Sequence, residues 1–209
     1  MSRALTWTRF LITGETGQAW TNHLTIIEVI VRADYTKINC FDMEMCCWGE
    51  GERRVGEIIS IGVTELCLLT GRSLQEAHYY VKPEKDEVSE YCSELTGITQ
   101  VMVNKQGRAL HQVLDTMKRK FGGNRKTYVA WGTDADYLNN ECLQKGIESP
   151  ISKTLNAALL YMIRTRHNGG QISMIKAMND AGLEFEGKQH NALVDAKNLS
   201  RLIYAKNLI

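Results

Sequence analysis

A pair of carboxylates two residues apart is the first feature of this sequence that could do chemistry. Asp42 and Glu44 lie in residues 37–46, where the residues alternate as they do in a strand, so both side chains project from one face. Adjacent carboxylates on a mostly apolar strand repel each other and lose solvation. A bound divalent cation removes that conflict, and oxygen ligands of this kind suit Mg²⁺ or Mn²⁺. A solvated strand edge explains the pair equally well, so the motif alone leaves both interpretations open.

A third carboxylate lies on the apolar side of the last predicted helix, residues 192–205. Asp195 falls one turn before Leu199, within a stripe of apolar positions at helical spacing. A carboxylate on a core-facing stripe is rarely there without a partner. The structural alternative is an acid near the helix start that the helix dipole stabilises. The position of Asp195 in the stripe favours the functional interpretation. The apolar members of the stripe are Ala192, Leu199, Leu202 and Ile203.

One histidine, His190, precedes Asp195 by five residues. On a continuous helix that spacing would place the two side chains about 140° apart. We therefore expect His190 on the loop before the helix, where its ring could overhang a site held by Asp195. By itself, His190 would be interpreted as an ordinary surface residue.

The fourth carboxylate is either Asp134 or Asp136, which both stand at the start of the helix predicted over residues 134–145. Asp134 lies one turn before Leu138 and points with the buried face, whereas Asp136 lies on the other side of the helix. Asp136 also has a structural use, because Thr133 and Asp136 approximate a capping box. We assign chemistry to Asp134 and capping to Asp136. An ordinary helix-terminus acid remains the alternative for Asp134.

The elements around these residues predict a layered α/β fold. Residues 155–166 fit a strand or a helix. Three adjacent strands followed by alternating helices and strands predict a mixed central sheet with helices on both faces. The predicted strands are residues 37–46, 57–69, 77–81 and 127–131, and the predicted helices are residues 88–95, 108–121, 134–145, 171–181 and 192–205.

The chain divides into two regions of unequal pattern. Residues 1–36 carry no motif, although residues 24–31 could form a strand, and we interpret them as an N-terminal extension of unknown role. Residues 37–209 contain every candidate site residue and are expected to form one domain.

Charge and cysteine content narrow the possible function classes. The net charge of +1 excludes a histone-like polycation, so a nucleic acid would have to meet a local basic surface. Residues 118–126 and 164–167 are candidates for it, although a solvated face explains both. The six cysteines include no C-x-x-C pair, which argues against a zinc ribbon. Free thiols without a secretion signal predict a cytoplasmic protein, and no apolar run reaches the length of about 18 residues that a membrane span needs.

Taken together, the candidate residues resemble a known family. The order Asp42-x-Glu44, then Asp134, then His190-x-x-x-x-Asp195 resembles the DEDDh exonucleases, a DnaQ-like group with the ribonuclease-H-like fold. The chain departs from the family pattern at WGTDAD, which is one residue shorter than the usual second motif, and in its first 36 residues, which have no counterpart. A narrower similarity to the Eri1/KapD-like exonucleases rests on FDMEMCCW, GEIISIGV, YVKP, LTGIT and the run GLEFEGKQHNALVDAKNLSRLI.

The resemblance implies a metal-dependent 3′–5′ exonuclease that releases nucleoside 5′-monophosphates from single-stranded 3′ ends, of RNA in preference to DNA. It implies two Mg²⁺ or Mn²⁺ ions. Asp42 would bridge both ions, Glu44 and Asp195 would complete the coordination of the first ion, and Asp134 would hold the second ion. His190 would act as the general base. A DNA-directed proofreading or repair exonuclease and a nucleic-acid-binding module without catalysis are the alternatives. The sequence predicts no oligomeric state.

Three side chains beside the first carboxylates could contact a nucleotide base. Met43, Met45 and Trp48 follow Asp42 closely and could wedge against the terminal base of a strand. Met43 more simply belongs to the core, because it faces away from Asp42 and Glu44.

Overall fold

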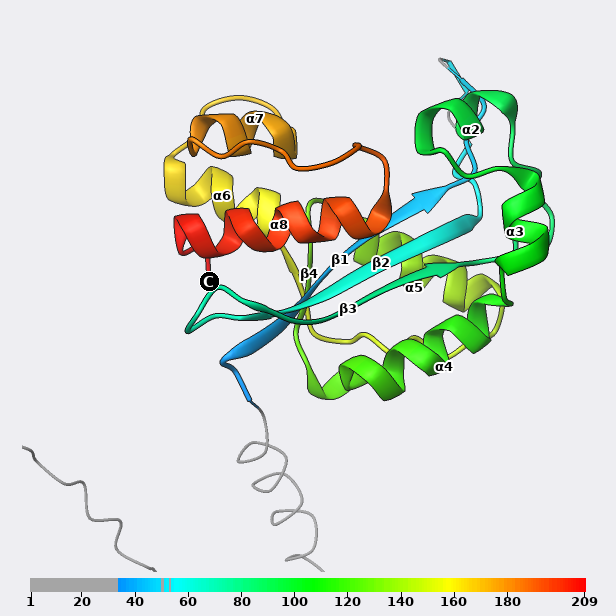
Figure 1. Cartoon of the computed structure of the whole chain (residues 1–209), viewed down its shortest axis with the longest axis horizontal. Coiled ribbons are helices and arrows are strands. Elements are labelled where there is room, and N and C mark those ends of the chain that lie inside the picture. The colour runs from blue at the N-terminus through cyan, green and yellow to red at the C-terminus, as the bar shows by residue number, and fades with distance from the viewer. Residues whose placement is uncertain (1–33, 50, 53) are drawn as a thin grey trace, which may run out of the picture. The chain divides into compact units, whose positions relative to one another are not determined.

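The structure is a computed structural model that describes residues 34–209 except 50 and 53. The strand expected at residues 24–31 lies outside the described residues. Five strands form one mixed sheet in the order β3-β2-β1-β4-β5, in which β1, β2 and β3 are antiparallel and β4 and β5 run parallel to β1. The predicted mixed sheet is therefore confirmed (Figure 1). The strands are β1 (Lys37–Met45), β2 (Ile58–Cys67), β3 (Ser73–Tyr80), β4 (Tyr128–Ala130) and β5 (Thr154–Asn156).

Helices cover both faces of this sheet, as the sequence predicts. In Figure 1, α8 crosses one face, while α4 and α5 lie against the other. The helices are α2 (Glu90–Thr96), α3 (Gln100–Gln106), α4 (Leu110–Phe121), α5 (Asp134–Gln144), α6 (Ala157–Thr165), α7 (Met174–Asp180) and α8 (Ala192–Lys206), with a short 3₁₀ turn η1 (Gly123–Arg125).

Several elements differ from the sequence-based expectation, including α7, which begins at Met174 rather than at residue 171. Helix α3 was not predicted, and its weak apolar pattern explains why, since Val103 is its one buried residue. Residues 155–166 proved to hold both alternatives, because the short strand β5 leads directly into α6, whose first turn is capped by Asn156. Strand β3 begins at Ser73 rather than at residue 77. The sequence prediction started late because residues 73–76 include one apolar side chain, Leu74, and so show no apolar alternation.

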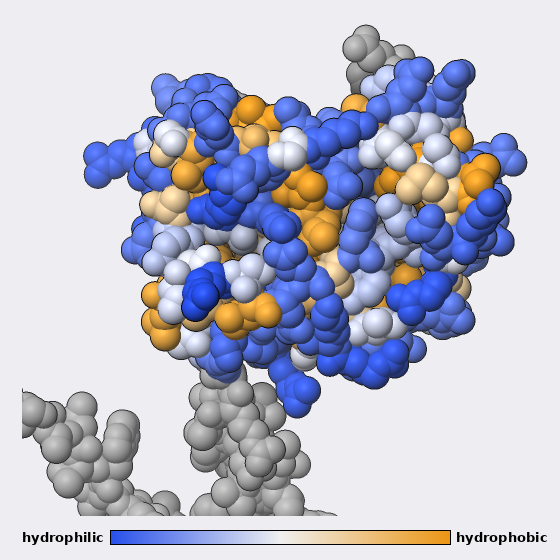
Figure 2. Space-filling model, viewed as in Figure 1, coloured by the Kyte–Doolittle hydropathy of each residue, from blue (hydrophilic) through white to orange (hydrophobic). Residues whose placement is uncertain are grey.

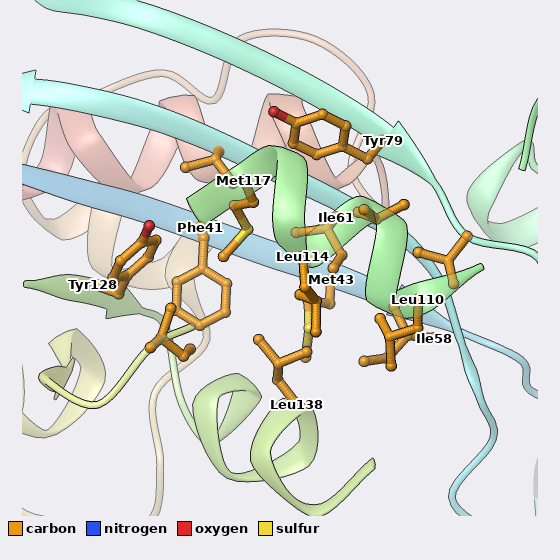
Figure 3. Packing of buried hydrophobic residues seen from close by; sticks show 14 of the residues in the cluster. Phe41, Met43, Ile58, Ile61, Tyr79, Leu110, Leu114, Met117, Tyr128 and Leu138 are labelled. Atoms are coloured by element: carbon orange, nitrogen blue, oxygen red, sulfur yellow. The ribbon is translucent and has the colours of Figure 1, made fainter. Parts of the chain in front are cut away.

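The two sides of β1 contribute to two separate cores. Phe41 and Met43 pack against α4 and α5, together with Ile58 and Ile61 of β2 (Figure 3). Ile38 and Cys40 pack on the opposite side, against α6, α7 and α8. Because side chains alternate along a strand, Asp42 and Glu44 share the side of Cys40, so they face α8.

Cysteine state and helix length can also be compared with the sequence. All six cysteines are free thiols, and Cys40, Cys46, Cys92 and Cys142 are buried. None of the helices in the described part of the chain is long and apolar enough to cross a membrane.

Candidate active site

Three of the predicted carboxylates converge on the α8 side of β1. One oxygen each from Asp42, Glu44 and Asp195 can be chosen so that all three lie within 4.8 Å of one another. Glu44 and Asp195 are buried, and Asp42 is half-buried. A set of three hard oxygen donors at this spacing fits a divalent cation such as Mg²⁺ or Mn²⁺. Asp42 and Glu44 of β1 thus form one candidate metal site with Asp195 of α8, although α8 is remote from β1 in the sequence.

A glycine of β2 allows α8 to reach these strands. Gly62 pairs with Asp42 across the hairpin, and the first turn of α8 lies directly over it. A Cβ atom on Gly62 would stand 2.1 Å from the carbonyl carbon of Ala192, far inside van der Waals contact. The missing side chain lets the backbone of α8 rest on β2, and this close approach places Asp195 beside β1.

The start of α8 also orients Asp195. The backbone N–H of Asn191 donates to Oδ2 of Asp195 at 2.9 Å, and Oδ1 of Asn191 accepts from the N–H of Val194 at 3.2 Å. These two bonds cap the helix reciprocally and hold the carboxylate in one rotamer. Asp195 is therefore a first-turn acid, as the structural alternative predicts, and also faces the other carboxylates.

Asp134 rather than Asp136 belongs to this region. Asp134 is the first residue of α5, which follows β4, the strand parallel to β1, and its side chain is half-buried. It lies outside the tightest group of three, but its charge acts on both Asp42 and Glu44. Asp136 is exposed.

The predicted capping box at the start of α5 is wrong. The side chain of Thr133 makes no capping hydrogen bond, and its backbone (φ −110°, ψ 17°) is not in the extended conformation in which a threonine hydroxyl caps a helix. The segment WGTDAD, residues 131–136, therefore leads into α5 without a side-chain cap, and Asp136 does not have the capping role predicted for it.

Burial and mutual repulsion make these acids hard to ionise in the isolated protein. Burial, followed by repulsion from Asp134, Glu44 and Asp195, raises the pKa of Asp42 well above its ordinary value. Burial and the charges of Asp195 and Asp134 raise the pKa of Glu44 to about 8. Burial raises the pKa of Asp134 to about 6, although backbone hydrogen bonds from Asp134 and Met43 oppose it. A cation would relieve this conflict.

The position predicted for His190 is confirmed. It lies on the loop before α8, is exposed, and adopts a left-handed backbone conformation with φ 60°. Burial raises the pKa of Asp195, while hydrogen bonding from Asn191 and the charge of His190 lower it. The imidazole thus lies close enough to act electrostatically on the acid cluster.

The side chains expected to wedge a base are differently placed. Met43 is buried in the core against α4 and α5, as its strand position predicts. Trp48 is half-buried, and the guanidinium of Arg54 lies 3.6 Å from the centroid of its ring. Arg54 itself is held by Asp86 at 2.7 Å. One face of Trp48 is therefore already covered and is not open for base stacking. Met45 is half-buried and packs against the same core as Met43.

The first basic cluster lies away from the acids. Phe121, at the end of α4, accepts a hydrogen bond from Asn39 near the start of β1, roughly 10 Å along the strand from Asp42 and 16 Å from Glu44 at about 3.3 Å per residue. Within this cluster Lys126 pairs with Glu65 at 3.3 Å. The second cluster, residues 164–167, is exposed at the end of α6. On the face shown in Figure 2, hydrophilic and hydrophobic residues alternate over α8, and hydrophobic residues are exposed near the middle of this face, on the side of α8 toward α2 and α3.

Gly62 and Asn191 shape the site but were not among the residues predicted from the sequence. Gly62 stands within a long apolar run, and a glycine in a strand interior often marks a close approach of another backbone. Asn191 directly precedes an apolar periodic segment, the usual position of a helix N-cap. These patterns predict a close backbone contact at Gly62 and a helix start at Asn191, but neither pattern indicates that the contact places Asp195 beside β1.

The geometry agrees with comparisons to known proteins. Residues 40–203 match the Exonuclease family, and this span contains all five predicted site residues. The chain belongs to this family. It is a DEDDh 3′–5′ exonuclease by relationship, so the predicted family and the ribonuclease-H-like fold are confirmed. Enzymes of the family generally use divalent metal ions, in agreement with the acidic cluster.

Individual relatives show the extent of the similarity. The chain is 32% identical to the 3′-5′ exonuclease Snipper of Drosophila melanogaster over 195 residues, which cover 81% of this chain and 68% of Snipper. It is 30% identical to ERI1 exoribonuclease 2 of Danio rerio over 185 residues, covering 77% of this chain and 33% of that longer protein. The crystallographic structure of the nuclease domain of 3′hExo, a DEDDh family member bound to rAMP, superposes with a TM-score of 0.73 at 28% identity, covering 81% of this chain and 90% of that one.

Proposed function

We propose that this chain is a metal-dependent 3′–5′ exonuclease that releases nucleoside 5′-monophosphates from single-stranded RNA, using two Mg²⁺ or Mn²⁺ ions. The observation that carries the proposal is the convergence of Asp42, Glu44 and Asp195 within 4.8 Å. No lysine or arginine of the described residues forms an ion pair with these acids. Carboxylates that are buried, close together and without a lysine or arginine partner are stabilised in their ionised form by a cation from solution.

Each of the five side chains has a proposed task. Asp42, on which the charges of Asp134, Glu44 and Asp195 all act, would bridge both ions. Glu44 and Asp195 would complete the coordination of the first ion, and Asp134 would hold the second. Two ions in such a site stabilise the attacking and leaving oxygens of phosphodiester cleavage. His190 would take a proton from the attacking water, since it is exposed on the loop before α8 and its charge acts on Asp195.

Two features support RNA as the preferred substrate. The relative from Danio rerio is named an exoribonuclease, and the structure of 3′hExo contains rAMP. Single strands are favoured because their bases can be splayed and reached at the 3′ end. The hydrophobic surface on the side of α8 toward α2 and α3 would suit an unpaired base (Figure 2). A DNA-directed enzyme and a binding module without catalysis are the competing proposals.

The test is an assay on 5′-labelled single strands of RNA and DNA of one sequence, with Mg²⁺, Mn²⁺ or EDTA. We expect a ladder that shortens stepwise from the 3′ end with either metal and disappears in EDTA. Asp42→Asn protein, purified identically, is the control for contaminating nuclease. Binding without degradation under either metal would contradict catalysis and favour the binding module, whereas faster degradation of DNA would contradict only the RNA preference.

We also propose that residues 37–209 are the catalytic domain and that residues 1–36 are a dispensable extension. Every site residue lies after Lys37, where β1 begins. A chain that starts at Asp34 should therefore keep its activity, and a folded but inactive product would contradict this. The free state of all six cysteines supports the cytoplasm as the proposed compartment.

A further inference from the structure

The loop that carries His190 is attached to α8 through one buried amide. Asn198 is 1% exposed, and its Oδ1 accepts from the backbone N–H of Glu186 at 3.0 Å. Its Nδ2 donates to the carbonyl oxygen of Glu186 at 2.9 Å and to that of Val194 at 2.9 Å. The amide thus holds both backbone groups of Glu186 as a neighbouring strand would, although this segment belongs to no strand.

Further contacts tighten this attachment. Nη1 of Arg201 donates to Oδ1 of Asn198 at 2.8 Å and to the carbonyl oxygen of Glu184 at 2.9 Å. Gly187 has φ 93°, and a Cβ atom there would stand 2.9 Å from Cγ1 of Val194. The segment is therefore pressed onto α8 immediately after Glu186, and only residues 187–189 separate this contact from His190.

The ring of His190 has no fastening of its own. No hydrogen bond to that ring is formed by the residues that the structure describes, and the side chain is exposed. Its direction is set by the backbone, which is fixed on one side by the N-cap Asn191 and on the other by the attachment of Glu186 to Asn198. The left-handed conformation of His190 itself carries strain that these two attachments must maintain.

We propose that Asn198 is a positioning residue for the reaction, one that aims the imidazole of His190 at the metal-bound carboxylates by holding Glu186 on α8. The inference rests on the proposed general-base function of His190. Asn198 touches neither the acid cluster nor any substrate position, so its effect would pass through the loop. A displacement of about 1 Å at a reacting group can cost about 100-fold in rate, which is why such a support matters.

A double-mutant cycle separates positioning from general support of the fold. Asn198→Ala is made in the wild-type chain and in a His190→Ala chain, and single-turnover cleavage of labelled RNA, Mn²⁺ affinity and the thermal midpoint are measured for each. We expect Asn198→Ala to lower the rate about 10–100-fold in the wild-type chain, as loss of a supporting residue does. In the His190→Ala chain it should cause no further loss, and Mn²⁺ affinity should stay unchanged in both.

Ser200→Ala is the matched control. Ser200 is buried on the same helix, but its hydroxyl bonds only to the carbonyl oxygen of Lys197 within α8. This variant should lower the thermal midpoint without changing the rate. If Asn198→Ala fails to fold, Asn198→Asp keeps the acceptor for Glu186 and Arg201, loses the donor, and should show the same dependence on His190.

The outcomes distinguish this inference from the proposed function. Equal rate losses from Asn198→Ala in both backgrounds, or a loss in Mn²⁺ affinity, would show that Asn198 supports the fold or the metal site and would overturn the positioning role. An equal rate loss in Ser200→Ala would do the same. A wild-type protein that degrades no strand would overturn the proposed function and this inference together.

Discussion

Two groups of carboxylates in this molecule differ in how their negative charge is compensated. Around the start of β2, Glu57, Glu84 and Glu141 surround Lys145, whose Nζ lies 2.6, 3.0 and 3.5 Å from their carboxylate oxygens. Burial acts against ionisation of Glu57, but Lys145 and three backbone N–H groups lower its pKa to about 2. At the active site, burial and repulsion raise the pKa of Glu44 to about 8. The two groups therefore differ in their partners: Lys145 supplies a cation to the first, whereas no lysine or arginine of the described residues forms an ion pair with Asp42, Glu44 or Asp195.

The largest expected effect separates the two groups by their partners. Asp42→Asn should abolish measurable turnover and Mn²⁺ binding without lowering stability. The substitution removes a negative charge whose proposed partner is the bound cation, not a group of the protein. Lys145→Met should destabilise the fold by about 3 kcal/mol, since it leaves buried carboxylates unpaired, while Mn²⁺ affinity per folded molecule stays unchanged. Calorimetric Mn²⁺ titration and thermal unfolding of both variants decide. Loss of Mn²⁺ binding in folded Lys145→Met protein would end the distinction.

The second test concerns which acid of α5 belongs to the active site. Asp134→Asn should lose nearly all turnover, because Asp134 is half-buried and its charge acts on Asp42. Asp136→Asn should leave turnover unchanged and alter stability by less than about 0.5 kcal/mol, as exposed substitutions usually do. Steady-state rates at saturating Mn²⁺ measure the difference. The reverse ranking would mean that the second motif is read in the wrong register.

The third test compares the two basic residues beside the two groups. Lys145 is a permanent counter-ion, whereas His190 is proposed to exchange a proton with water. His190→Ala should therefore lower turnover about 10²–10⁴-fold, the usual contribution of a general base, while Mn²⁺ affinity stays nearly intact. Calorimetry beside single-turnover rates provides the measurement. If His190→Ala binds Mn²⁺ as poorly as Asp42→Asn, then His190 is a ligand or support for the metal.

The smallest expected effect is a pH dependence of stability with opposite signs in the two groups. The folded pKa of Glu44 is raised from 4.5 to about 8, so its contribution is present at acidic pH and is lost as pH rises toward 8. The folded pKa of Glu57 is lowered from 4.5 to about 2, so its contribution is present above 4.5 and is lost as pH falls toward 2. A change of 1 kcal/mol in the free energy of unfolding shifts the thermal midpoint by roughly 2–4 °C in a chain of this size.

Thermal unfolding in EDTA across pH measures both limbs. Glu44→Gln should flatten the decline that runs from about pH 4.5 up to about pH 8, and Glu57→Gln should flatten the decline that runs from about pH 4.5 down to about pH 2. Saturating Mn²⁺ should suppress the alkaline decline in the wild-type chain, because the ion stabilises the ionised carboxylates. An alkaline decline that Glu44→Gln and Mn²⁺ leave unchanged would refute the assigned cause.

Local pattern was sufficient wherever a side chain's direction depends on its own element. The alternation of β1 placed Asp42 and Glu44 on one face, the apolar stripe placed Asp195 on the buried side of α8, and the five-residue spacing placed His190 before the helix. The buried face of α5 similarly selected Asp134. These inferences held because strand and helix periods are set by backbone geometry, which the local sequence selects.

What the sequence by itself determined is therefore the family, the layered fold and the side of its own element on which each of the four candidate acids lies. The tertiary structure decided how far apart these side chains lie, because the contact of α8 with Gly62 joins segments 130 residues apart, and no local period encodes such a contact. It also decided which acidic group has a basic partner. Lys145, at the end of α5, pairs with Glu57, whereas no lysine or arginine of the described residues forms an ion pair with Asp42. Charge balance inside a protein depends on neighbours in space, which long-range packing selects.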